Sequence, residues 1–361
     1  MAKIDAFLEL VVKQNASDLH FVSGSPPIIR LHGSMERIKF QTLKHEDVKT
    51  FLFEIMSEEQ KKSFEETNDF DFAYQIDNVA RFRVNVFMQR NGMGAVFRQI
   101  PTKIKTTEEL SLPDAVKQFA FLKKGLVLVT GPTGSGKSTT LAALIDLINK
   151  TRAAHIITIE DPLEFVHENQ KSILTQREIG LHADSFAKAL RAALREDPDV
   201  ILVGEMRDLE TISLAITCAE TGLLVFGTLH TNSAPKTMDR IIDVFPVDQQ
   251  EQIRVMLSDS LKGIVAQQLI KTADGKGRVA ATEILVGIPS LGNIIREGKT
   301  HMIPSLMQTG KKYGMQTMDD CLLNLLNQQK ITPLDAYDKA IDKATFEKHV
   351  KDHVKDGVPI N

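Results

Sequence analysis

The sequence predicts a two-domain α/β protein. A small module with an antiparallel sheet comes first, and a larger domain with an open, mainly parallel sheet between helices follows. In the second part of the chain, apolar runs alternate with helical patterns, as in parallel sheets. A strand, a glycine-rich turn and a helix follow one another between Leu126 and Ile148. A hairpin pattern with a tight turn at Asn91-Gly92 lies in the first hundred residues.

The composition is that of an ordinary globular protein. Of the 361 residues, 42% are hydrophobic and 25% are charged, and this length suits two or three domains. A formal net charge of −3 gives no overall attraction for nucleic acid, so no direct nucleic-acid partner is expected. Cys218 and Cys321 are far apart in sequence, which argues against a zinc knuckle or a disulfide framework and fits a reducing cytoplasm.

The N-terminal segment lacks the pattern of a signal peptide. Lys3, Asp5 and Glu9 interrupt its apolar residues, which fall on one face of a predicted helix. No apolar run approaches the length needed to cross a bilayer. We therefore expect no transmembrane segment, and a role at a membrane would go through partner proteins.

Residues 1–100 are predicted to form the first domain. Pro26 to Gly33 has the pattern of a strand that ends in a glycine turn. Residues 46–65 carry periodic apolar residues and are predicted to be helical. Alternating apolar and polar residues predict further strands at 69–74, 81–87 and 95–100.

Pro101 to Leu112, polar and rich in threonine and lysine, is the predicted linker, and residues 113–361 form the predicted second domain. Ser185 to Arg195 is predicted to be an amphipathic helix that Pro198 ends. Four apolar runs after the glycine-rich turn are predicted to be strands: His155–Ile159, Ile173–Thr175, Val200–Val203 and Leu224–Leu229.

The glycine-rich turn carries the pattern G-x-x-x-x-G-K-S. It consists of Gly131, Pro132, Thr133, Gly134, Ser135, Gly136, Lys137, Ser138 and Thr139. The glycines let consecutive backbone N–H groups turn toward a phosphate, and the helix that follows adds the positive end of its dipole. Lys137 is expected to reach the β- and γ-phosphates, and the Ser138 hydroxyl to ligate Mg²⁺. The turn predicts a nucleoside triphosphate site.

Three polar clusters follow the ends of predicted strands, at 160–164, 204–208 and 227–231. Because parallel strands end at one edge of a sheet, these clusters are expected near the phosphates. The first suits a base that orients or deprotonates water, although a solvated acidic turn is the plainer interpretation. In the second, Glu205 could hold Mg²⁺ through water. In the third, His230 could sense the γ-phosphate, hold the second cluster in place, or be structural.

Arg81, Arg83 and Arg98 lie on the predicted hairpin. The hairpin alone favours a solvated strand face. The second interpretation is that these arginines are offered to the phosphates of a neighbouring subunit. The residues by themselves leave both interpretations open.

Several motifs together resemble one family. They are GPTGSGKST, ITIEDPLEFVH, ALREDPDVILVGEMRDLET and AETGLLVFGTLHTNSA. With SDLHF near the start and SLMQTGKKYGMQTMDDCL near the end, the resemblance covers nearly the whole chain. The family is the secretion ATPase superfamily, and within it the chain is most similar to the PilT family of type IV pilus retraction motors.

This resemblance implies an N-terminal PAS-like α+β domain and a C-terminal RecA-like P-loop ATPase domain in a homohexamer. ATP would lie between the domains and against the adjacent subunit. The resemblance implies Glu164 as the general base, Glu205 as the magnesium-associated glutamate and His230 as the histidine-box residue. It also implies that Arg83 and Arg98 reach the nucleotide, which favours the second interpretation of the hairpin.

The implied function is a cytoplasmic ATPase, peripheral at the inner membrane, that hydrolyses ATP with Mg²⁺ to depolymerise pilin and drive twitching motility. The implied partners are other copies of the chain, an inner-membrane pilus platform protein and a PilT paralogue. Four alternatives are an accessory, PilU-like paralogue, a pilus extension or type II secretion ATPase, a nucleic-acid translocase, and a nucleotide-binding scaffold. Extension and secretion relatives typically carry a four-cysteine zinc site, whereas this sequence has two cysteines.

One stretch departs from the family pattern. PilT proteins commonly carry A-I-R-N-L-I-R-E, a sequence linked to retraction, and residues 290–297 here read S-L-G-N-I-I-R-E. Asn293, Arg296 and Glu297 match, but Gly292 stands in place of the first arginine. The ATP-hydrolysing motifs are unaffected, and the departure bears on whether this chain drives retraction alone or as an accessory.

Overall fold

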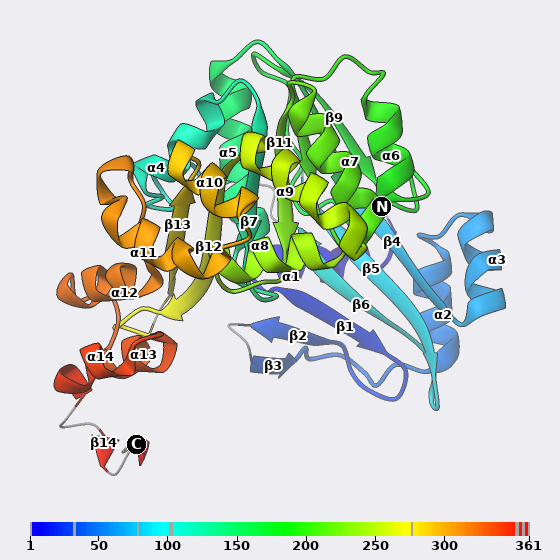
Figure 1. Cartoon of the computed structure of the whole chain (residues 1–361). Helices are drawn as coiled ribbons and strands as arrows, with labels where there is room; N and C mark the ends of the chain where they lie inside the picture. Colours follow the sequence, from blue (N-terminus) through cyan, green and yellow to red (C-terminus); the bar gives the residue numbers. More distant parts are fainter. Residues whose placement is uncertain are drawn as a thin grey trace. The chain divides into compact units, whose positions relative to one another are not determined.

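The computed structural model describes residues 2–31, 34–77, 79–100, 104–275 and 277–350, and the backbone of two short strands, β14 (Val354–Lys355) and β15 (Val358–Pro359). The chain divides into two compact units, Met1–Lys103 and Ile104–Asn361, each with its own hydrophobic core. Figure 1 shows the elements of both units. Leu112, at the end of the predicted linker, packs into a core of the second unit.

The first unit is a six-stranded antiparallel sheet in the order β3-β2-β1-β6-β5-β4. Its strands are β1 (Asp18–Val22), β2 (Ile28–Leu31), β3 (Ser34–Arg37), β4 (Asp69–Ile76), β5 (Ala80–Gln89) and β6 (Gly92–Ile100). Its helices are α1 (Asp5–Lys13), α2 (His45–Phe53) and α3 (Glu58–Thr67). The fully buried rings of Phe21, Phe82 and Phe97 lie in its core.

The helical prediction for residues 46–65 is confirmed except for a break, because α2 ends at Phe53 and α3 begins at Glu58. Ser57 separates them in an extended conformation, and its side chain accepts a hydrogen bond from the Gln60 backbone N–H. Gln60 in turn accepts one from the Ser57 N–H at 2.9 Å, which completes a capping box. The S-E-E-Q sequence carries this start signal, which apolar periodicity alone does not detect.

The predicted hairpin is confirmed. Strands β5 and β6 pair antiparallel from Arg81–Ile100 to Gln89–Gly92, around a two-residue turn at residues 90–91, one residue before the predicted Asn91-Gly92. Gly92 has a φ of +114°, in the region that favours glycine. Arg83 and Arg98 lie directly opposite each other on these strands.

The second unit is built on a seven-stranded sheet in the order β13-β12-β7-β11-β10-β8-β9. Its strands are β7 (Gly125–Thr130), β8 (His155–Glu160), β9 (Ile173–Glu178), β10 (Val200–Val203), β11 (Leu224–Leu229), β12 (Leu261–Lys271) and β13 (Arg278–Val286). All pairs are parallel except β12–β13. The mainly parallel sheet and its predicted strands are confirmed, and β12 and β13 add two strands that the sequence analysis did not identify.

Helices cover both faces of this sheet. The helices of this unit are α4 (Asp114–Gln118), α5 (Lys137–Thr151), α6 (Phe186–Ala193), α7 (Leu209–Glu220), α8 (Ala234–Asp243), α9 (Val247–Ser260), α10 (Pro289–Arg296), α11 (Ile303–Thr309), α12 (Met318–Asn327), α13 (Pro333–Lys339) and α14 (Lys343–Val350), of which α13 and α14 pack on each other beyond the sheet. In the part of the chain that the structure describes, no helix is long and apolar enough to cross a membrane.

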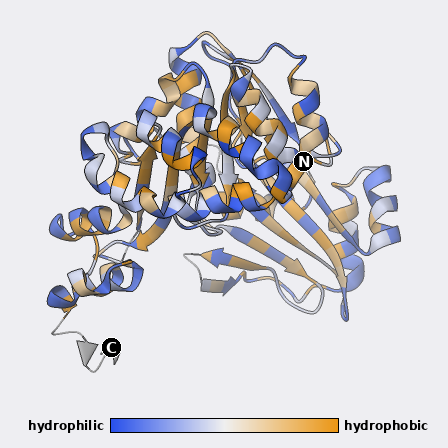
Figure 2. Ribbon diagram, viewed as in Figure 1, coloured by the Kyte–Doolittle hydropathy of each residue, from blue (hydrophilic) through white to orange (hydrophobic). Residues whose placement is uncertain are grey.

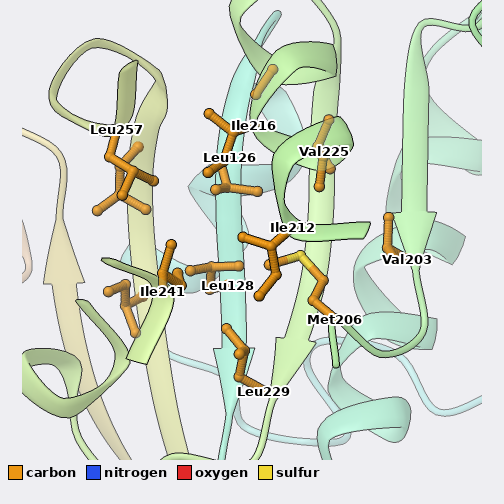
Figure 3. Close-up of a cluster of buried hydrophobic side chains, with 14 of the residues drawn as sticks. Leu126, Leu128, Val203, Met206, Ile212, Ile216, Val225, Leu229, Ile241 and Leu257 are labelled. Atoms are coloured by element: carbon orange, nitrogen blue, oxygen red, sulfur yellow. The ribbon is translucent and has the colours of Figure 1, made fainter. Parts of the chain in front are cut away.

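Strand β7 shows how one sheet serves two cores. Leu126 and Leu128 belong to the core shared with α7, where Figure 3 shows them near Ile212 and Ile216. The alternate residues, such as Val127, pack in the core on the α5 side. A strand buried on both faces must be apolar throughout, and the ribbon coloured by hydropathy in Figure 2 shows the central strands as largely hydrophobic.

One glycine of β12 is required by side-chain packing. A Cβ atom on Gly263 would lie 2.2 Å from the ring carbon Cζ of Phe119, which is itself buried. We predict that Gly263→Ala lowers the free energy of unfolding by about 1–3 kcal/mol, because the ring must move in a filled core. Urea unfolding measures the change, with Gly277→Ala, whose Cβ meets nothing closer than 3.6 Å, as the control. Equal stability of the two variants would contradict this packing argument.

Candidate active site

The polar clusters meet because four parallel strands end together. Ile159 of β8 pairs with Val203 of β10, and Val203 with Gly227 of β11. At the other side of β11, Leu229 pairs with Thr130, the last residue of β7. The residues that follow these strands therefore lie along one edge of the sheet, as the sequence predicts for the glycine-rich turn and the three clusters.

The glycine-rich turn connects β7 directly to α5. Gly131, Gly134 and Gly136 have φ angles of +145°, +77° and +87°, which L-residues rarely adopt. A Cβ on Gly131 would lie 2.2 Å from the backbone oxygen of Gln267 on β12, so a side chain there has no room. The Ser135 hydroxyl is buried and has no protein hydrogen-bond partner among the described residues, which marks the turn as a place for a polar ligand.

Lys137 is the first residue of α5. Its ammonium donates hydrogen bonds to the backbone oxygens of Gly131 at 2.9 Å and Pro132 at 3.2 Å, so it folds over the turn. Burial lowers the pKa of Lys137, and the charges of Glu205 and Glu164 act in the opposite direction. Both glutamates that the sequence singles out therefore lie within electrostatic reach of this lysine.

Glu205 is the most strongly held acid of the site. Arg207 Nε lies 2.6 Å from its carboxylate, and His230 Nε2 lies 3.1 Å from the same oxygen. The hydrogen bond from Arg207 is the main cause that lowers the pKa of Glu205. The sequence left three roles open for His230, and one of them was to hold the second polar cluster. The structure places the His230 side chain against Glu205 of that cluster.

Backbone hydrogen bonds fix the loop that carries Glu205. The Gly204 N–H donates to the Ile159 oxygen at 2.8 Å, and the Met206 N–H donates to the Thr228 oxygen at 3.1 Å. The Thr228 hydroxyl donates to the Gly204 oxygen. The loop after β10 is thus tied to β8 on one side and β11 on the other, and Glu205 lies between these anchors.

A small pocket lies beside the start of α5. Ser138, Glu160 and His167 line it together with Leu141, Ala142, Phe165, Leu202, Gly204 and Thr228. Burial raises the pKa of Glu160 to about 7, and the charge of Glu164 adds to this effect. Burial also lowers the pKa of His167 to about 4, so this imidazole is neutral at pH 7. Glu164 itself is exposed.

The predicted magnesium ligands fit the way proteins bind this ion. Mg²⁺ is usually held by one or two protein oxygens, substrate phosphates and water rather than by a closed protein cage. Within the described ranges, no three His, Cys, Asp or Glu side chains gather as a preformed metal cluster. The Ser138 hydroxyl lines the pocket, and the lowered pKa of Glu205 keeps this carboxylate ionised, so both predicted ligands have suitable chemistry.

The hairpin arginines have acidic partners on flanking strands. Arg98 Nε lies 2.8 Å from Asp18 Oδ1, and Arg83 Nε lies 3.5 Å from Asp71 Oδ1. Burial by itself would raise the pKa of Asp18, but hydrogen bonds from Ser17 and Arg98 leave it lowered. The Arg98 side chain remains 69% exposed, so its guanidinium group is both oriented by a buried carboxylate and open to other contacts.

Two residues of the site were missed by the sequence analysis. Arg207, which pairs with Glu205, lies inside the second polar cluster, so its charge two residues after Glu205 was the available signal. Gln267 supports the glycine-rich turn from β12. Its only signal is a polar residue within an apolar run, and that pattern does not reveal what it contacts.

The raised pKa of Glu160 gives a pH prediction for nucleotide-free protein in chelator. Its pKa rises from 4.5 unfolded to about 7 folded, so the native state holds more protons between these values. The free energy of unfolding should fall as pH rises through this window, by about 1–3 kcal/mol relative to Glu160→Gln. Urea unfolding at pH 5 and pH 8 measures the difference, with Glu168→Gln on the same loop as the control. Identical pH dependence of wild type and Glu160→Gln would contradict the assignment.

Comparison with known proteins shows the family to which the chain belongs. Residues 1–333 match the family model described as type II/IV secretion system protein. The chain is 53% identical over 337 residues to the type IV pilus retraction ATPase PilT of Pseudomonas aeruginosa. This alignment covers 93% of this chain and 98% of that protein. It is 44% identical over 334 residues to the type IV pilus ATPase PilU of the same organism, covering 92% of this chain and 87% of that protein.

A solved structure is similar over nearly the whole chain. The crystal structure of the pilus retraction motor PilT with bound ADP superposes with a TM-score of 0.90 at 47% identity, covering 96% of this chain and 99% of that one. The predicted fold class, a small α+β domain followed by a P-loop ATPase domain, is confirmed by this match. The chain therefore belongs to the type II/IV secretion system protein family and, within it, to the PilT family of ATPases.

Proposed function

We propose that this chain is a cytoplasmic ATPase motor that powers type IV pilus retraction as a homohexamer. The observation that carries the proposal is the gathering of Lys137, Glu205 and His230 around a P-loop at one sheet edge. This arrangement occurs in a chain 53% identical to a pilus retraction ATPase. The partners would be other copies of the chain, an inner-membrane platform protein of the pilus and a paralogue of the same family.

The glycine-rich turn at residues 131–139, which is the P-loop of this chain, supplies the nucleotide-binding half of the proposed mechanism. Its backbone N–H groups and the N-terminus of α5 would receive the β- and γ-phosphates of ATP. Lys137 would exchange its hydrogen bonds to the loop oxygens for bonds to phosphate, which is a stronger, charge-assisted contact. Ser138 and, through water, Glu205 would hold Mg²⁺, whose charge neutralises the phosphate oxygens when it is bound.

The acidic cluster supplies the proposed hydrolytic half. Glu164 is exposed in the loop after β8 and lies within electrostatic reach of Lys137, which suits a base that orients the attacking water. Glu205 is already engaged by Arg207 and His230 at 2.6 and 3.1 Å. We therefore assign the base to Glu164 and the metal-associated role to Glu205, with His230 holding that carboxylate in place.

An accessory role beside a second retraction motor is the alternative that one observation favours. Gly292 stands where the family resemblance leads us to expect arginine, and it is buried where α10 packs on α9. A Cβ on this glycine would lie 3.1 Å from the Ser258 backbone oxygen. This chain thus differs from the expected sequence in the contact between α9 and α10, which lies outside the glycine-rich turn and the three polar clusters.

Deletion of the gene tests the proposed function directly. A retraction motor predicts cells with more pili and no twitching, because assembled pili can no longer be withdrawn. Bald cells would mark an extension motor and overturn the proposal. Excess pili with twitching retained would instead point to the accessory role, and complementation with the wild-type gene is the control.

Two conservative variants separate the roles of the acids. Glu164→Gln should retain binding of ATP and Mg²⁺ but lose roughly 10²–10⁴ in turnover, the usual contribution of a general base. Glu205→Gln should also raise the Mg²⁺ concentration needed for activity. Phosphate release measured across a Mg²⁺ titration distinguishes them, with Glu168→Gln as a control for loss of charge on the same loop. Normal turnover by Glu164→Gln would move the assignment to Glu160 or Glu205.

The arginines give a prediction about subunits. We expect Arg83 and Arg98, which are opposite each other and partly exposed, to act on a nucleotide bound by another copy of the chain. An arginine supplied in this way contributes about 10³–10⁵ in turnover in other phosphoryl-transfer enzymes. The Arg83→Ala/Arg98→Ala protein and the Lys137→Ala protein should each be nearly inactive, while mixed assemblies regain activity. Mixed assemblies that form without regaining activity would contradict action between subunits.

A further inference from the structure

Gln267 is a buried polar residue on a strand that is otherwise mostly apolar. It is 2% exposed, and its neighbours along β12 include Val265, Ala266 and Ile270. A carboxamide removed from water destabilises the fold unless both of its ends are hydrogen-bonded. Its contacts therefore determine what this residue does.

Both ends of the amide are satisfied by the nucleotide-binding segment. Nε2 donates a hydrogen bond to the Ser135 backbone oxygen at 2.7 Å. Oε1 accepts one from the Thr140 hydroxyl at 2.8 Å. Because a carbonyl oxygen can only accept, the contact with Ser135 fixes which end of the amide is which. One side chain from β12 thus joins the P-loop to the first turns of α5.

Two glycines of the P-loop pack directly on Gln267. A Cβ on Gly131 would lie 2.2 Å from the Gln267 backbone oxygen, and a Cβ on Gly136 would lie 2.9 Å from its Nε2. The two glycines begin and end the loop between β7 and α5. Gln267 therefore contacts the loop at both ends. Its backbone oxygen lies against Gly131, and its side-chain amide lies against Gly136.

The bond to Ser135 also sets the direction of a backbone donor. In a trans peptide, the C=O of one residue and the N–H of the next point in opposite directions. Since the Ser135 oxygen is held toward β12, the N–H of Gly136 points away from β12. Release of the Ser135 oxygen would let this peptide rotate, because glycine at a φ of +87° has alternative conformations available.

We propose that Gln267 is a positioning residue that holds the P-loop in its nucleotide-binding shape through its amide bonds to Ser135 and Thr140. The proposal rests on the proposed function, because it takes the phosphates of ATP or ADP as the ligand of this loop. In this proposal Gln267 acts on the nucleotide only through the residues of the loop and of α5 that it contacts. A purely structural role would stabilise the fold without changing the affinity for nucleotide.

The test compares Gln267→Met with Gln268→Met in the full-length protein. Methionine is similar in size to glutamine but cannot make the two amide bonds, and Gln268 is the next residue on β12, whose side chain leaves the opposite face. Affinity for MgADP is measured by calorimetry, and stability is measured by urea unfolding without nucleotide. We expect Gln267→Met to weaken MgADP binding about 10- to 100-fold, as for a lost buried hydrogen-bond pair, while Gln268→Met binds as wild type does.

The outcomes separate this inference from the proposed function. Unchanged MgADP affinity in folded Gln267→Met would overturn the inference, even if its stability falls, and would leave the proposed function standing. Failure of both wild type and Gln268→Met to bind MgADP would overturn both. If Gln267→Met does not fold, Thr140→Val removes only the hydroxyl that orients the amide. It should weaken MgADP binding by about 3- to 10-fold, and unchanged affinity in that variant would also overturn the inference.

Discussion

The functional side chains of the second unit depend on the common direction and register of four parallel strands. Strands β7, β11, β10 and β8 are hydrogen-bonded in that order and end at the same edge. Each strand is buried along most of its length, so the charged side chains of the site lie at or beyond the points where the strands leave the sheet. The P-loop and the polar clusters are therefore separated by tens of residues in sequence but are adjacent in space. Without this register, Lys137, Glu164 and Glu205 would not share an electrostatic environment.

The charges of the site are held by protein partners before any ligand is considered. Arg207 and His230 engage Glu205, and the P-loop oxygens engage Lys137. Such contacts keep partly buried charges from being left without partners, which would destabilise the fold. They also orient the groups, because the carboxylate and the ammonium are fixed in place by contacts from different elements. A bound triphosphate would then redistribute existing contacts rather than order a flexible loop.

In the first unit, charged side chains on an antiparallel sheet also have protein partners. Alternation places the phenylalanine core on one face and charged residues on the other, where Asp18, Arg98 and Arg83 lie on three successive strands. Asp18 is nearly buried while Arg98 is largely exposed. A buried acid beneath an exposed guanidinium restricts the rotamers of the arginine without covering it. Arg83 and Arg98 on the hairpin are thus both ion-paired and partly exposed.

The sequence by itself determined the elements whose signals are local. The P-loop, the hairpin and the buried strands were predictable because glycine geometry, period-two alternation and apolar runs act within a few residues. Ser57 was missed although its capping signal is local, since periodicity hid it. Only the tertiary structure decided that Arg207 and His230 share Glu205, that Glu160 and His167 line one pocket, and that Gln267 supports the P-loop. Strand order and packing bring Gln267 to the P-loop, and its hydrogen bonds to residues more than a hundred positions away leave no periodic pattern in a single sequence. Arg207 and Glu205 are only two residues apart, but a charge pair in a loop has no periodicity that would indicate whether the two side chains meet.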